Sequence, residues 1–151
     1  MRIRPALTVV VSLLLISGVT SAVADTITPT RDEQIASIHS KYDPMFEDLS
    51  ARLTKLATKV KLDTNLARQY KAVLLDFTTM RGTINDGLAS ANGDVEAMGQ
   101  LAEEETGEFN STIYNLEMDA ARIKTITCVK VKTIKKVSGI TPKCPTGYKK
   151  K

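Results

Sequence analysis

Three long stretches of the chain repeat apolar residues at spacings of three and four, and no other feature limits the possible folds as strongly. This period places such side chains along one face of an α-helix. The first stretch carries Ile35, Ile38, Tyr42, Met45, Leu49, Leu53, Leu56 and Val60. The second carries Leu66, Tyr70, Val73, Phe77, Met80, Ile84 and Leu88. The third carries Val95, Met98, Ala102, Glu105, Phe109, Ile113, Leu116, Ala120 and Ile123, with Glu105 as a polar lapse.

The first of these helices has a recognisable start. Thr30 followed by Glu33 fits a capping box, in which each side chain accepts a hydrogen bond from the other residue's backbone. Pro44 lies inside the predicted helix and removes one backbone donor. Because the apolar pattern stays in phase across Pro44, we expect a kink or a frayed first segment rather than two separate helices.

The two connections between helices are marked by polar residues and glycine. Asp63 or Thr64 can cap the second helix. Asn92-Gly93-Asp94 marks the next boundary. There we expect Gly93 to adopt the left-handed conformation that ends a helix, and Asp94 to cap the third helix.

The three predicted helices are of similar length and have short connectors. This favours a mainly α fold, an antiparallel three-helix bundle or coiled coil, over residues 25–124. The alternative is a long helical hairpin in which the first two stretches form one helix through Asp63. That arrangement would leave one apolar face exposed to water, so the bundle is preferred.

Residues 1–24 have the organisation of a secretory signal peptide. Arg2 and Arg4 precede an apolar run of 14 residues, and Ala22-Val23-Ala24 fits a cleavage site. An uncleaved membrane anchor is the alternative, but a spanning helix needs roughly 20 apolar residues. We therefore expect an exported protein, extracellular or associated with the cell envelope, that contacts a membrane only if the signal stays uncleaved.

Residues 125–151, here called the C-terminal cassette, change from a helical to an alternating pattern. Two runs rich in β-branched residues, 125–130 and 133–137, predict a β-hairpin. The connecting Val131-Lys132 lacks the glycine or asparagine that two-residue turns favour. Further on, Cys144-Pro145-Thr146-Gly147 predicts a type I turn, with proline second and glycine fourth.

Both cysteines of the chain, Cys128 and Cys144, lie in the cassette. In an exported protein they most simply form one disulfide, which would stabilise the cassette by about 3 kcal/mol. Zinc binding is the alternative, but there is no Cys-x-x-Cys pair and the single histidine, His39, lies far away in the sequence. We expect no metal ion and no other cofactor.

Charge is segregated along the chain. Residues 25–123 hold 17 acidic and 10 basic residues, whereas the segment from Lys124 onward holds nine lysines and no acid. Such a cationic end should bind polymers rich in phosphate or carboxylate. The predicted binding residues are Lys130, Lys132, Lys135, Lys136, Lys143, Lys149, Lys150 and Lys151.

The partner expected for these lysines is an anionic polymer of the cell envelope. Nucleic acid is not expected, because Tyr148 is the only aromatic side chain of the cassette on which a base could stack. A basic end that only aids solubility is the alternative.

The cassette also resembles the C-terminal segment of a group of exported actinobacterial proteins. Their pattern is I-T-C-V-K-G-K-x-x-K-K-V, a spacer and P-K-C-P-x-G-Y-K-K. The matching residues here are Ile126, Thr127, Cys128, Val129, Lys130, Lys132, Lys135, Lys136, Val137, Pro142, Lys143, Cys144, Pro145, Gly147, Tyr148, Lys149 and Lys150. Val131 departs from the pattern, which has glycine in the turn. The resemblance implies export and retention at the cell surface, and the molecular function of the group is not established.

Two functions are compatible with these features. The first is a secreted, non-enzymatic envelope protein whose helices act as a spacer or interaction body, with possible self-association, while the cassette retains it. The alternative is an extracytoplasmic carrier or chaperone that grips an apolar client between helices bearing Met45, Met80 and Met98. An enzyme is not expected, because one histidine and no free thiol leave little from which to build a catalytic triad.

Overall fold

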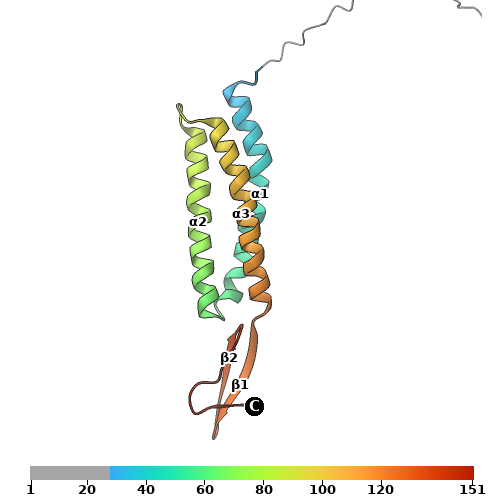
Figure 1. Cartoon of the computed structure of the whole chain (residues 1–151), viewed down its shortest axis with the longest axis vertical. Coiled ribbons are helices and arrows are strands. Elements are labelled where there is room, and N and C mark those ends of the chain that lie inside the picture. The colour runs from blue at the N-terminus through green and yellow to red at the C-terminus, as the bar shows by residue number, and fades with distance from the viewer. Residues whose placement is uncertain (1–27) are drawn as a thin grey trace, which may run out of the picture.

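The computed structural model describes residues 28–151, so the predicted signal peptide lies outside the described residues. Three helices, α1 (Arg31–Val60), α2 (Thr64–Ala89) and α3 (Val95–Ala121), form an antiparallel bundle with a small β-sheet at one end (Figure 1). The predicted mainly α fold is therefore confirmed. The chain reverses direction after α1, which excludes the alternative of one long helix through Asp63.

The predicted caps begin each helix. At α1 the capping box is complete: the Glu33 N–H donates to Thr30 Oγ1, and the Thr30 N–H donates to Glu33 Oε2 at 2.7 Å. Asp63, rather than Thr64, caps α2, and Asp94 caps α3. Between its caps α1 passes through Pro44 as one continuous helix.

The helices pack through their apolar faces, and one phenylalanine from each helix meets at the centre. The ring centroids of Phe46 and Phe77 are 6.0 Å apart, and those of Phe77 and Phe109 are 5.3 Å apart. The first pair is tilted and the second is edge-to-face, and aromatic contacts of this kind add to the stability that burial of the rings provides. The buried apolar residues of the bundle are Tyr42, Phe46, Leu49, Leu53, Leu56, Val60, Leu66, Phe77, Ile84, Leu88, Val95, Ala102, Phe109, Ile113, Leu116 and Ala120.

Two predicted core positions are wrong by one residue. Met45 is 45% exposed and its neighbour Phe46 takes the core position. Likewise Thr106 is buried in place of Glu105. The Thr106 hydroxyl donates to the carbonyl oxygens of Ala102 and Glu103, so this polar group is buried without an unmet hydrogen bond.

The expected left-handed conformation of Gly93 is also wrong, because its φ is not positive. The residue matters for a different reason, which is the close approach of two backbone segments. A Cβ at Gly93 would lie only 1.9 Å from the carbonyl oxygen of Gly87. Arg31 stabilises this connection between α2 and α3 by donating hydrogen bonds to the carbonyl oxygens of Gly93 and Ser90.

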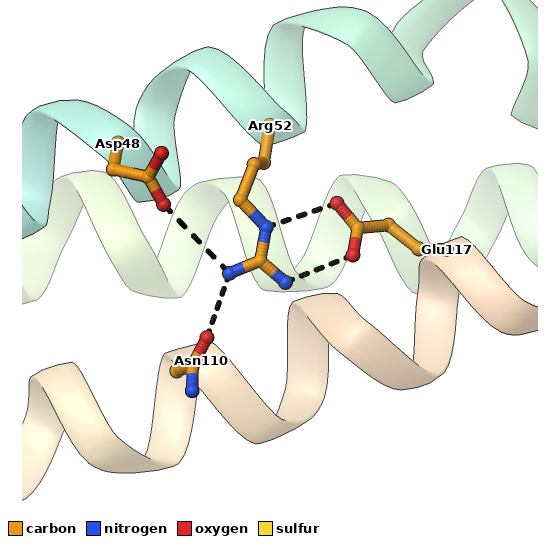
Figure 2. Close-up of polar contacts among 4 residues, drawn as sticks. All are labelled: Asp48, Arg52, Asn110 and Glu117. Carbon is orange, nitrogen blue, oxygen red and sulfur yellow. Dashed lines mark hydrogen bonds and ion pairs between the residues drawn. The ribbon is translucent and has the colours of Figure 1, made fainter.

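A polar clamp joins α1 to α3 in the half of the bundle nearer the β-sheet (Figure 2). Nε and Nη2 of Arg52 each donate to one carboxylate oxygen of Glu117, both at 2.9 Å. Nη1 donates to the side-chain oxygen of Asn110 and lies 3.9 Å from Asp48. Arg52 lowers the pKa of Glu117 by hydrogen bonding and by its charge.

The chain after α3 forms a three-stranded antiparallel sheet. Its strands are β1 (Lys124–Lys130), β2 (Thr133–Gly139) and β3 (Lys149–Lys150), in the order β2-β1-β3. The predicted hairpin is thus present, and β3 pairs with the free edge of β1. Among the described residues, no helix has the length and apolar character needed to cross a membrane.

Candidate polyanion-binding site

The register of the sheet decides which cassette residues share a face. Cys128 lies opposite Lys135 on β2 and Lys150 on β3, so these three side chains point to one side of the sheet. Val129 lies opposite Ile134 and Lys149, so these point to the other side. The sheet therefore has a cysteine face and an opposite face.

The segment between β2 and β3 packs over the cysteine face. Cys144 of this segment forms the disulfide with Cys128, whose side chain is completely buried. Tyr148 lies nearby, with the Nζ atom of Lys135 5.2 Å from the centre of its ring. The cation thus contacts the electron-rich ring face, which orients a side chain that would otherwise move freely.

The predicted type I turn over residues 144–147 is wrong by one position. The hydrogen bond that closes the turn runs from the Tyr148 N–H to the Pro145 carbonyl oxygen at 2.9 Å. Gly147 is then the third residue of the turn and has a φ of 82°. A positive φ at this place is the mark of a type II turn, and it requires glycine in preference to other residues.

All eight lysines predicted to bind a polyanion are exposed, and none forms an ion pair with a carboxylate of the described chain. They do not share one surface. Lys130, Lys135 and Lys150 lie on the cysteine face, and Lys136 and Lys149 on the opposite face. Lys132 is in the hairpin turn, Lys143 in the loop and Lys151 at the end of the chain. The cassette is therefore cationic on both sides.

The sequence-based set omitted Lys124, which is exposed at the start of β1. It also omitted the two apolar side chains at the far end of the hairpin, Val131 and Ile134, which are 92% and 64% exposed. Alternation of β-branched residues identified the strands but could not show that these two side chains would face solvent.

Asp63 fixes the cassette to the bundle. Its Oδ1 atom caps α2 by accepting hydrogen bonds from the N–H groups of Asn65 and Leu66. Its Oδ2 atom accepts a hydrogen bond from the N–H of Ile140, just after β2, at 3.0 Å. A Cβ at Gly139 would lie 3.0 Å from this oxygen, so glycine makes room for the contact. The bond from Ile140 is the main reason why the pKa of Asp63 is lowered.

Polar groups elsewhere form local contacts. His39 Nδ1 lies 3.1 Å from Asp43 Oδ2, one turn along the same helix. Burial, together with the charges of Glu108 and Glu104, raises the pKa of Glu105. Within residues 28–151, no three side chains of the metal-binding types are grouped so that they could hold an ion.

Comparison of the chain with protein families, with curated proteins and with solved structures gives no match.

Proposed function

We propose that this protein is an exported, non-enzymatic component of the cell envelope, in which the cassette binds an anionic envelope polymer. The observation that carries the proposal is the set of eight exposed cassette lysines that have no carboxylate partner in the described chain. Lysine side chains are strongly hydrated and mobile, so they attract phosphate and carboxylate groups without demanding a fixed geometry.

The distribution of the lysines favours a flexible polymer over a compact ligand. Cations on both faces of a thin sheet cannot all touch one small molecule. A flexible polyanion can instead follow the surface and contact several lysines in turn. The acidic body, with 17 acidic against 10 basic residues in residues 25–123, would be repelled by the same polymer. Binding would therefore be confined to the cassette end.

The bundle would act as a spacer or interaction body. Its three apolar faces are packed against one another, and each helix is on the order of 40 Å long at 1.5 Å per residue. Leu74 and Leu75 remain exposed on α2, and they offer a surface for self-association or for another protein.

The disulfide supports export, because such bonds persist mainly in oxidising compartments outside the cytosol. The signal-peptide prediction for residues 1–24 points the same way. Export and envelope retention are separate steps, and only the second depends on the lysines.

The test is fractionation of cells into envelope and medium with two matched variants. In the cassette variant, Lys130, Lys132, Lys135 and Lys136 are changed to glutamine. In the control variant, four exposed lysines of the bundle, three on helices and one in the connection between α1 and α2, are changed in the same way: Lys55, Lys59, Lys71 and Lys61. Both variants lose four positive charges, so a difference between them reports the position of the charge rather than its amount.

We expect the control variant to stay in the envelope fraction and the cassette variant to appear in the medium. High salt should release the unchanged protein as well, because the screening length falls from about 8 Å at physiological ionic strength to about 3 Å at 1 M. Equal retention of both variants, or retention that ignores salt, would refute the proposal.

A carrier of apolar molecules is a second candidate, and one observation favours it. A groove of about 510 Å³ lies between the first turns of α1 and α3. Ile38, Tyr42 and Val95 contribute to its walls, and Gly99 allows the close approach of Ile38. A carrier function predicts that a hydrophobic dye binds the folded protein there and that Gly99→Leu blocks it. A folded protein that does not bind the dye would exclude this function.

A further inference from the structure

The end of the hairpin combines apolar and cationic side chains. Val131, in the turn, is 92% exposed, and Ile134, near the start of β2, is 64% exposed. Ile134 is paired across the strands with the half-buried Val129, on the face that the disulfide loop does not cover. Water thus contacts the apolar side chains of Val131 and Ile134 at the end of the hairpin, here called the tip.

Val131 makes no evident contribution to the fold. Its φ is 53°, in the left-handed region where a β-branched residue is strained. Its side chain also gains almost no burial in return. Glycine would satisfy the same turn without strain, so the role of this valine is to be sought outside the folded chain.

The apolar tip is flanked by positive charge. Lys132 lies beside Val131 in the turn, and Lys136 shares the face of Ile134. Lys130 and Lys135 lie on the cysteine face of the same hairpin, and all four lysines are exposed. A hydrated polymer would satisfy these lysines but would leave the apolar side chains in water. The boundary between lipid headgroups and acyl chains offers both environments at once, since phosphates meet the lysines and hydrocarbon meets the valine and isoleucine.

The position of the tip permits contact with a flat surface. The β1–β2 hairpin projects from the end of the bundle, and its turn forms the end of the molecule opposite the start of α1 (Figure 1). A planar surface can therefore reach the tip without meeting the acidic helices.

From this juxtaposition we propose that the hairpin tip inserts into the surface of an anionic lipid bilayer. Val131 and Ile134 enter the headgroup–acyl boundary, the surrounding lysines contact lipid phosphates, and the bundle stands away from the membrane. This contact is additional to the one expected through an uncleaved signal. It shares lysines with the proposed function, but it rests on a separate observation, the exposed apolar pair.

A fluorescent reporter at the tip tests the proposal directly, because the chain contains no tryptophan. In the full chain, Ile134→Trp places an indole at the tip on a strand position that suits aromatic residues. Thr83→Trp places one on the exposed surface of α2 as a control. Both proteins are mixed with phosphatidylglycerol-rich vesicles, with neutral phosphatidylcholine vesicles, and with soluble polyphosphate. Because the signal is local, the N-terminal segment shared by both proteins does not obscure it.

We expect the emission of Ile134→Trp to shift to shorter wavelength, and brominated lipids to quench it, with anionic vesicles only. The emission of Thr83→Trp should not change. Four results would each overturn the proposal. The protein could fail to bind the vesicles, or it could bind while the indole at position 134 keeps the emission of an indole in water. The emission could also shift at both positions, or shift equally with neutral vesicles.

A variant with a less apolar tip separates this proposal from the proposed function. Val131→Gly combined with Ile134→Thr should weaken binding to anionic vesicles about tenfold, as expected for the loss of apolar burial. It should bind polyphosphate as the unchanged protein does. The variant with four cassette lysines changed to glutamine should lose both activities. Equal vesicle binding by the tip variant and the unchanged protein would contradict insertion and leave polymer binding intact.

Discussion

At the scale of single residues, Asp63 has two structural roles that separate oxygen atoms perform. Oδ1 caps α2, and Oδ2 holds the N–H of Ile140 in the cassette. Because these hydrogen bonds favour the charged carboxylate, they lower its pKa in the folded protein. One side chain thus connects the start of a helix with a segment 77 residues further along the chain.

The lowered pKa of Asp63 predicts how the contact between the bundle and the cassette, here called the joint, responds to acid. Its contribution to stability is complete above the ordinary aspartate pKa, and it is lost as the pH falls through the lower value of the folded state. The amide signal of Ile140, followed by NMR during acid titration, should therefore change at a pH below the ordinary aspartate pKa.

Asp63→Asn should keep the cap of α2, because asparagine is also a good cap, but should release Ile140 to faster hydrogen exchange. Slow exchange at Ile140 in this variant would show that other contacts hold the joint.

The second prediction at this scale concerns the strained turn. Val131→Gly should stabilise the cassette by about 1 kcal/mol, because glycine adopts a positive φ without the clash that Val131 bears. The neighbouring Lys132, whose φ is not positive, supplies the control. Lys132→Gly should not stabilise the cassette, since it only adds flexibility to the unfolded chain. Hydrogen exchange of the β1 and β2 amides measures both effects, and equal changes in the two variants would contradict the explanation.

At the scale of elements, α1 and α3 are joined by the clamp around Arg52 (Figure 2). The side chains of Arg52 and Glu117 are only 20% and 33% exposed, so water screens this pair less than a pair on the open surface. The two parallel hydrogen bonds also set the position of α1 along α3. Apolar faces alone permit small slips between helices, whereas a two-pronged polar contact does not.

Loss of the clamp should destabilise the bundle measurably. Glu117→Gln should lower the free energy of unfolding by about 1–2 kcal/mol, because it removes the charge that Arg52 faces. Asp119→Asn is the control, since it breaks a similar pair with the exposed Arg122 and should cost close to zero. Chemical denaturation near neutral pH checks both. Because the pKa of Glu117 is lowered, the difference between Glu117→Gln and the unchanged protein should shrink in acid. Equal losses of unfolding free energy in the two variants would show that the Arg52–Glu117 pair stabilises the bundle no more than an exposed ion pair does.

Helix positions and caps were predictable because their signals are local. The apolar period gave the helices, and Thr30, Asp63 and Asp94 gave their starts. Which residue of a helix points into the core is harder to predict where two adjacent residues are both apolar. Met45 and Phe46 are both apolar, and packing against Phe77 selects the second.

The candidate site was only partly predictable for a related reason. Lysine content and the two cysteines identified the cassette from the sequence. The division of the lysines between two faces depends on strand register, which composition does not contain. The bond from Ile140 to Asp63 depends on the tertiary structure, because 77 residues separate its partners.

At the scale of the whole molecule, an acidic bundle and a basic cassette are held apart although their charges attract. Each of the eight cassette lysines is exposed and unpaired within the described chain. The sheet is fixed at the end of the bundle by the short connection from α3 and by Asp63, so it extends away from the helices (Figure 1). This arrangement keeps the cations available to an external partner.

The same arrangement predicts that the two parts unfold separately when the disulfide is removed. The bundle has its own core, whereas the small sheet depends on the bond between Cys128 and Cys144. Changing both cysteines to alanine should cost the cassette about 3 kcal/mol, the loop-closure entropy that the bond removes from the unfolded chain. Circular dichroism should then show an unchanged helical melting transition, while NMR shows loss of the β1 and β2 amide protection.

The Cys128→Ala, Cys144→Ala protein would keep its lysines, so its binding to polyphosphate also measures how far binding depends on the folded sheet. Melting of the helices together with the cassette would show instead that the contact through Asp63 makes the molecule one cooperative unit.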